Sequence, residues 1–153
     1  MAEAVTELIE QESEQKDKFL TFSIGNEFYG IEIKYVTEII GIQPITEVPE
    51  MSDYMRGIIN LRGKIIPVMD VRLRFGKSFK EYNDRTCIIV VDIEDISVGL
   101  IVDGVSEVMD ICEENIVPPP EIGNNYSRYI KGIGRMGNDV RLLLDCNKLL
   151  NEY

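Results

Sequence analysis

The chain has 153 residues, of which 44% are apolar and 28% charged, a composition typical of a soluble globular protein. Its net charge of −11 argues against a nucleic-acid or anionic-membrane surface, because both are bound by clustered lysine and arginine. Histidine is absent and no glycine-rich phosphate loop is present, which excludes Ser–His–Asp and Cys–His nucleophiles, most zinc hydrolases and a phosphohistidine relay within this chain.

Two further features concern location and metal chemistry. No apolar run approaches the ~20 residues that span a bilayer, and the N-terminus lacks the basic start and apolar stretch of a signal peptide, so we expect a cytoplasmic protein. The three cysteines, Cys87, Cys112 and Cys146, are widely spaced without a C-x-x-C pair. We expect them to be reduced residues in or near the core, with no metal site and no cofactor.

The first predicted elements follow a polar N-terminal segment. Residues 1–17 are rich in glutamate and glutamine and predict a mobile acidic tail. Residues 19–24 and 28–33, separated by a Gly-Asn turn, predict a pair of strands. Residues 34–40 carry apolar side chains at i, i+3 and i+4 spacing and predict a short helix or a sharp bend.

A second predicted hairpin joins residues 57–61 to residues 64–70, with its turn at Arg62 and Gly63. Pro67 has no amide hydrogen to donate, so its strand is expected at a sheet edge or with a bulge. A short helical turn follows, and the polar residues 77–85 predict the boundary between two halves of the chain.

The second half repeats this order. Residues 87–91 and 98–102 predict a hairpin, residues 105–109 a bend, and residues 132–135 and 140–144 a last hairpin before a C-terminal helical turn.

The repeat is visible in the sequence itself. Residues 19–40 match residues 88–109 at an offset of 69, and residues 54–58 match residues 129–133 at an offset of 75. Short strands separated by turns predict an all-β protein of two SH3-like barrels, each of five or six strands, packed about a shared hydrophobic interface. The sequence divides into subdomains 18–83 and 84–153. A strand exchanged between the halves would leave the same repeat, so the division in space need not follow this boundary.

The turn at residues 60–63 is the sharpest local motif. It is either an ordinary β-turn with a solvated arginine or a turn that presents Arg62 to a partner, since arginine is enriched among interface hot spots. At the matching positions of the second copy, Gly137 replaces Arg62 and Leu142 replaces Pro67. A residue that the fold requires would be expected in both copies. The difference therefore favours the interpretation that this turn presents Arg62 to a partner.

A second motif, V-[ST]-E-[IV], occurs at residues 36–39 and 105–108. Its apolar members either pack the seam between the halves or form a strip, flanked by carboxylates, on which another protein's helix docks. A third reading makes Glu38 and Glu107 paired catalytic carboxylates, but no cofactor motif accompanies them. We therefore predict no catalytic residue.

Four segments of the chain resemble the CheW family of bacterial chemotaxis coupling proteins. They are residues 28–33, 36–39, 56–70 and 98–105, and the resemblance extends from about Lys18 to Leu150. It implies two SH3-like barrels and a non-catalytic adaptor. Such an adaptor couples the cytoplasmic tips of chemoreceptors to the regulatory domain of the histidine kinase CheA.

The resemblance also implies binding residues. Those expected to face the receptor tip are Val36, Glu38, Ile39, Arg62, Val105 and Val108. Those expected to lie toward the kinase are Arg56, Lys64, Ile65 and Pro67. The protein is expected to be a monomer alone and to be recruited to the inner face of the membrane through receptor arrays, with no direct insertion.

Three alternatives remain open. The nearest is a coupling module of the same fold that serves another two-component motility pathway. The others are a small enzyme that acts through carboxylates and a purely structural oligomeric module.

Overall fold

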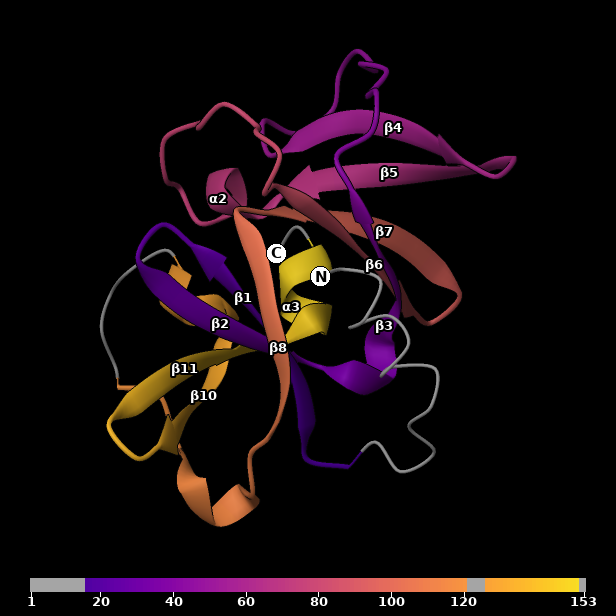
Figure 1. Ribbon diagram of the computed structural model, residues 1–153. Helices are drawn as coiled ribbons and strands as arrows, with labels where there is room; N and C mark the ends of the chain where they lie inside the picture. The colour runs from indigo at the N-terminus through magenta and orange to yellow at the C-terminus, as the bar shows by residue number, and fades with distance from the viewer. Residues whose placement is uncertain (1–15, 121–125, 152–153) are drawn as a thin grey trace.

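The computed structural model describes residues 16–120 and 126–151, and it consists mainly of two curved β-sheets (Figure 1). The six-stranded sheet has the order β8-β1-β2-β11-β10-β9 and the five-stranded sheet the order β3-β6-β7-β5-β4. The prediction of an all-β protein with two SH3-like barrels of five or six strands is confirmed. We call the five-stranded barrel the first barrel and the six-stranded one the second barrel. The predicted acidic tail lies outside the described residues except for Lys16 and Asp17.

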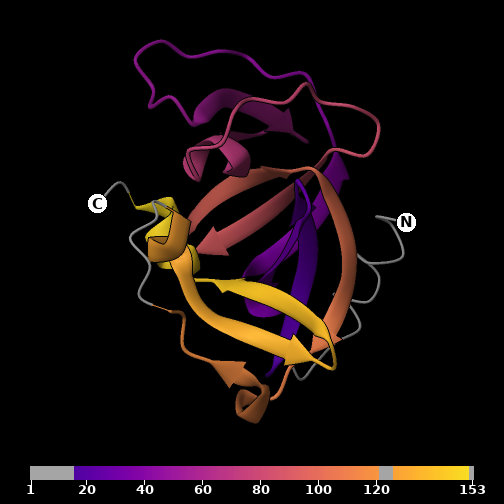
Figure 2. The same cartoon turned by 90° about the vertical axis from the view of Figure 1, so that its left-hand side faces the viewer.

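The strands are mostly six or seven residues long. Their bounds are β1 Lys18–Ile24, β2 Glu27–Glu32, β3 Val36–Gly41, β4 Met55–Leu61, β5 Lys64–Asp70, β6 Cys87–Ile93, β7 Ile96–Val102, β8 Gly104–Asp110, β9 Ile116–Val117, β10 Ile130–Met136 and β11 Asp139–Leu144. The short helices are η1 Ile33–Tyr35, α2 Val71–Arg74, η2 Glu113–Asn115, η3 Tyr126–Tyr129 and α3 Cys146–Leu150. Figure 2 shows from a second side that α3 lies between the two sheets.

The two sequence copies exchange strands. β1 and β2, from the first half, lie in the sheet of the second barrel, whereas β6 and β7, from the second half, lie in the sheet of the first barrel. The exchange is reciprocal, because the antiparallel pair Leu20–Val108 has its counterpart in Ile89–Ile39 at the offset of 69. The sheets therefore do not follow the division of the sequence at residues 83–84.

The repeat also governs the short helices. Asp70 and Asp145 occupy matching positions, and each side chain caps the helix that follows by accepting a hydrogen bond from the amide of Leu73 or Lys148. A capping carboxylate satisfies an amide that the helix itself leaves unpaired. The same aspartate amide hydrogen-bonds the carbonyl of Tyr54 in one copy and that of Tyr129 in the other.

Two predicted bends are strands. The segments that contain residues 36–40 and 105–109 form β3 and β8, and the i, i+3 spacing arises from a β-bulge instead of a helix. In β3 the register shifts between Val36 and Glu38, so one extra residue enters the strand. An extra residue reverses the alternation of side chains, which lets Val36 and Ile39 face the same side.

The prediction for Pro67 needs a correction. β5 lies between β7 and β4 and is not an edge strand. Its pairing with β7 begins only at Val68, whereas Pro67 lies opposite Ile58 of β4. The proline is therefore tolerated because β5 does not pair with β7 at that position, so no backbone amide is needed there.

Three apolar clusters stabilise the described fold. The largest lies between the barrels and includes Leu20, Phe22 and Tyr29 of the second barrel with Ile89 and Leu100 of the first. We call it the shared core. The interior of the first barrel contains Ile59, Ile66, Val68, Ile88, Val90 and Ile101 as buried residues. Among the described residues, the interior of the second barrel contains Phe19, Ile111 and Leu143.

The cysteines differ in their surroundings. Cys146 is buried in the shared core and Cys87 is half-buried beside it, as expected, but Cys112 is exposed, which corrects the prediction for that residue. All three are free thiols. Burial raises the pKa of the Cys146 thiol to about 12, so this residue is a packing residue without thiolate chemistry.

Candidate partner-binding surfaces

The β4–β5 turn presents Arg62 on a left-handed backbone. Arg62 and Gly63 have φ angles of 52° and 89°, as a tight two-residue hairpin turn requires, and the amide of Gly63 donates to Oδ1 of Asn60 at 2.8 Å. The Arg62 side chain is 70% exposed, and its guanidinium donates to Oε1 of Glu38 on β3, a side chain that is 24% exposed. The two charged residues predicted to face a receptor therefore lie together.

This ion pair borders a polar groove of about 290 Å³ at one opening of the first barrel. Lys64 also lines the groove and donates from Nζ to Oγ of Ser97 at 2.8 Å, and the Ser97 hydroxyl donates in turn to Asp92. The groove thus offers arginine and lysine donors beside two carboxylates, an arrangement suited to polar side chains of another protein.

The four valine and isoleucine residues predicted to face a receptor are less accessible. Val36 and Ile39 are each 6% exposed and belong to the shared core. Val105 and Val108 are half-buried and pack against the same core. Val105 lines a separate groove of about 370 Å³ with Gly41 and other residues. The structure therefore brings Glu38 and Arg62 together at one groove, and it gives Val36 and Ile39 a packing role.

Ile65 lies at the exposed end of an apolar strip. Residues Ile66 and Val68 face the interior of the first barrel, so Ile65, Pro67 and Met69 face outward. Met69 at one end of this strip is buried in the shared core, whereas Ile65 at the other end is 57% exposed. The apolar surface that joins the barrels therefore continues beyond the part that the second barrel covers.

Ile96 enlarges this surface and was not predicted from the sequence. Ile65 and Ile96 hold corresponding positions on β5 and β7, since each lies three residues before its member of the first pair, Val68 with Gly99. Ile96 is 59% exposed. Like Met69 and Val98 of the shared core, Ile65 and Ile96 lie on the outer face of the first barrel, and two exposed β-branched side chains on one face offer apolar surface of the kind that anchors protein interfaces. We call it the Ile65–Ile96 patch.

Arg56 lies apart from this patch. It is at the opposite end of the hairpin, where its guanidinium stacks on the Phe79 ring at 4.8 Å from the centroid. Phe79 meets Tyr82 edge-on, and the Tyr82 hydroxyl donates to Oδ2 of buried Asp70 at 2.7 Å. Burial and this hydrogen bond raise the pKa of Tyr82. Of the four residues predicted to lie toward a kinase, Ile65 and Pro67 share a face, Lys64 lines the neighbouring groove and Arg56 belongs to an aromatic cluster.

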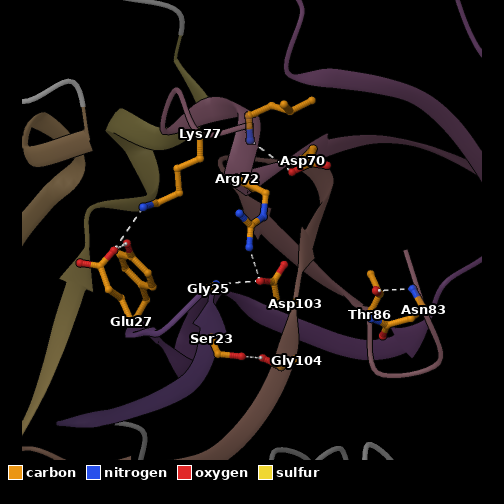
Figure 3. Close-up of polar contacts among 12 residues, drawn as sticks. Ser23, Gly25, Glu27, Asp70, Arg72, Lys77, Asn83, Thr86, Asp103 and Gly104 are labelled. Carbon is orange, nitrogen blue, oxygen red and sulfur yellow. Dashed lines mark hydrogen bonds and ion pairs between the residues drawn. The ribbon is translucent and has the colours of Figure 1, made fainter. Parts of the chain in front are cut away.

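A polar seam joins the barrels on another side (Figure 3). Arg72, in α2, donates to Oδ2 of Asp103 at 2.6 Å, and the amide of Gly25, in the β1–β2 turn, donates to the same oxygen at 2.7 Å. Lys77 pairs with Glu27 of β2 at 3.3 Å. These contacts hold the end of the first barrel against the β1–β2 hairpin.

The geometry does not support the hypothesis that Glu38 and Glu107 are paired catalytic carboxylates. Glu38 is on β3 and paired with Arg62, whereas Glu107 is on β8 in the other sheet. In residues 16–120 and 126–151, no group of three or more histidine, cysteine or acidic side chains is arranged to hold a metal ion. None of the helices in these ranges is long and apolar enough to cross a membrane.

Comparison with known proteins shows extensive similarity. The family model described as CheW, a CheW-like domain, matches residues 18–153. The chemotaxis protein CheW of Klebsiella aerogenes is 38% identical over 136 residues, which cover 88% of this chain and 82% of that protein. The chemotaxis protein CheW of Treponema pallidum is 31% identical over 145 residues, which cover 92% and 85% of the two chains. The crystal structure of the scaffolding protein TtCheW from Thermoanaerobacter tengcongensis superposes with a TM-score of 0.79 at 38% identity and covers 84% of this chain and 88% of that one.

Proposed function

The chain belongs to the CheW family, and from this premise we propose that it is a chemotaxis adaptor that couples chemoreceptors to a histidine kinase. In this role it binds the cytoplasmic tip of a chemoreceptor on one surface and the regulatory domain of the kinase CheA on another. It acts without catalysis. It is recruited to the inner face of the membrane through its contact with the receptor.

The observation that carries this proposal is the presence of two chemically different surfaces on the first barrel, to both of which the β4–β5 hairpin contributes. The Glu38–Arg62 groove is polar and lies at an opening of the first barrel. The Ile65–Ile96 patch is apolar and lies on the outer face of the same barrel. A protein that must hold two partners at once needs two such surfaces that do not overlap.

We assign the groove to the receptor tip and the patch to the kinase. The receptor tip is a helical hairpin, and Arg62 can exchange its bond with Glu38 for a carboxylate or carbonyl on a helix. The patch offers the buried apolar anchor that a stable complex of two folded domains requires. Pro67 and Lys64 contribute at the border of the two surfaces.

The coupling of receptor to kinase depends on the rigidity of the first barrel, which carries both surfaces. The groove and the patch both include residues of the β4–β5 hairpin, whose other end packs into the shared core. A change in the receptor tip therefore alters the position of the kinase through a body that does not itself rearrange. Such a body biases the kinase only by contacts that differ between the two receptor states.

A three-component binding experiment tests the proposal. The purified chain is titrated with a receptor-tip fragment, with the kinase regulatory domain, and with both together. We expect each fragment to bind separately and the ternary complex to form without competition. Binding of neither fragment would overturn the adaptor role, and mutual competition would overturn the assignment of separate surfaces.

A further inference from the structure

We propose that α3 is a lid over the shared core and that Arg74, a residue of α2, is the latch that holds this lid closed. α3 places the side chains of Cys146 and Leu149 in the shared core, and both are buried there. Figure 2 shows α2 above α3 at the junction of the barrels. Opening of α3 would therefore uncover part of the apolar surface along which the two barrels meet.

Arg74 reaches from α2 to the carboxyl end of α3. Its Nε donates to the carbonyl oxygen of Leu149 at 2.9 Å, and its Nη2 donates to that of Lys148 at 3.5 Å. Nη2 also donates to the carbonyl oxygen of Asn151. The last carbonyls of a helix have no partner within the helix, so an arginine beside them satisfies groups that would otherwise need another donor. One guanidinium of the first sequence copy thus closes the end of a helix in the second copy.

The internal repeat shows why α3 depends on this donor. α2 is closed by its own chain, because Gly76, with a φ of 80°, donates its amide to the carbonyl of Leu73 at 2.9 Å. Glycine adopts the left-handed conformation that such a helix end requires. At the offset of 75, Asn151 replaces Gly76, and its backbone is extended with a φ of −86°. The same offset matches Arg74 with Leu149, so the latch exists in one copy only.

Two tyrosines at matching positions of the repeat hold the guanidinium in place. Its central carbon lies 4.2 Å from the centroid of the Tyr54 ring and 4.9 Å from that of the Tyr129 ring. Tyr129 in turn stacks on Phe75 of the shared core, with 5.9 Å between the ring centroids. A planar guanidinium stacks on aromatic rings while its edge donates hydrogen bonds, which a lysine ammonium cannot do. The latch therefore depends on the planar fork of arginine as well as on its charge.

The size of α3 makes its opening a local event. The helix has five residues, too few to be stable without contacts to the rest of the protein. Its described contacts include the cap from Asp145 in its own copy, the two buried side chains and the bonds from Arg74. Without Arg74, we expect α3 to leave the shared core more often while the strands of both barrels stay paired.

Alkylation of Cys146 in the full chain tests the proposal. Iodoacetamide reacts with an accessible thiolate, so Cys146 should react only when α3 has opened. Arg74→Ala should raise its alkylation rate at least about tenfold, because hydrogen bonds from a charged group are lost. Cys112 is already exposed and should keep its rate. Mass spectrometry of the digested chain resolves the two thiols.

A series of urea concentrations separates the lid from global unfolding. Local opening exposes little surface, so the Cys146 rate in Arg74→Ala should change little at low urea, whereas global unfolding would make it rise steeply. Arg74→Lys keeps the charge without the planar fork and should raise the rate less than Arg74→Ala does. The lysine variant also keeps the test available if the alanine variant does not fold.

Arg128→Ala is the matched control. The Arg128 guanidinium lies 5.6 Å from the centroid of the same Tyr129 ring, so its removal takes away a similar contact without touching the latch. The Cys146 rate should stay at the wild-type value. An equal rise in Arg128→Ala, an unchanged rate in both Arg74 variants, or a rise with the urea dependence of global unfolding would each overturn the proposal.

Discussion

Arg72 and Asp103 form an ion pair across the junction of the two barrels, with 2.6 Å between Nη2 and Oδ2. Arg72 belongs to the helix that follows β5, whereas Asp103 lies between β7 and β8, at the point where the chain passes from one sheet to the other. The amide of Gly25 donates to the same carboxylate oxygen. One carboxylate thus fixes three segments, and its protonation should loosen the junction.

The substitution Asp103→Asn should lower the free energy of unfolding by roughly 1–3 kcal/mol at pH 7, the range for hydrogen bonds to a charged group. Burial alone would raise the pKa of Asp103, but the bonds from Arg72 and Gly25 lower it below the ordinary value of 3.8. A carboxyl with a lowered folded pKa stabilises the fold above the unfolded pKa and ceases to do so as the pH falls through the folded pKa. The difference from wild type should therefore shrink below about pH 4, as urea denaturation at a series of pH values would measure.

Asp110→Asn is the control for this experiment. Asp110 pairs with Lys18, but its side chain is 68% exposed, so its removal should change the unfolding free energy by less than about 1 kcal/mol. An Asp103→Asn variant whose stability relative to wild type did not depend on pH would contradict the assigned role of the carboxylate.

Arg62→Ala should weaken binding of a receptor-tip fragment by about tenfold or more while the melting temperature stays within error of wild type. The reason is that the Arg62 side chain is mostly exposed, so its bond to Glu38 adds little to the fold but leaves the guanidinium accessible. Calorimetric titration and a thermal melt measure the two quantities. Arg135→Ala, which removes an exposed arginine of β10, is the matched control and should retain wild-type affinity.

Ile65→Asp should reduce the affinity for the kinase regulatory domain by about tenfold or more, because it places a charge in the Ile65–Ile96 patch. Val140 occupies the matching position of the second copy and is 48% exposed, so Val140→Asp introduces the same charge at the equivalent site of the other barrel. It should leave kinase binding unchanged. Equal losses for both variants would refute a contact specific to the first barrel.

Gly57→Ala should destabilise the fold by about 3 kcal/mol or more. Gly57 has a φ of 140°, and an added Cβ would lie 2.1 Å from the carbonyl oxygen of Thr46. Gly41 has nothing within 4 Å of an added Cβ, so Gly41→Ala should cost less than about 1 kcal/mol. Thermal and chemical denaturation of the two variants would distinguish backbone strain and steric overlap from a general effect of alanine.

The hairpins could be predicted because their turns have local signals. The turns between β1 and β2, between β4 and β5 and between β6 and β7 contain residues with positive φ, including Gly25, Arg62 and Asp95. Glycine adopts this conformation readily, and aspartate adopts it more often than most residues. For β3 and β8 the sequence predicts bends where the structure has strands, because a bulge gives a strand the i, i+3 spacing that a helix also produces.

The candidate surfaces were only partly predictable, because they depend on pairs that are distant in sequence. Arg62 stands out in its own turn, but its bond to Glu38 joins residues 24 positions apart. Ile96 carries no signal of its own and shares a sheet face with Ile65 only because β5 and β7 pair across the two halves. The burial of Val36 and Ile39 likewise follows from the packing of one barrel on the other.

The exchange of strands sets an order for folding during synthesis. The first barrel lacks β6 and β7 until the ribosome has passed residue 102, and the second lacks β11 until residue 144 has emerged. β1 and β2 are synthesised first, but they cannot complete their pairing until β8 and β11 have been synthesised. Their apolar faces therefore stay uncovered in the meantime. Late pairing of early strands is slow and exposes sheet edges to other nascent chains. The first hairpin of this protein is thus the segment whose apolar faces stay uncovered longest during synthesis.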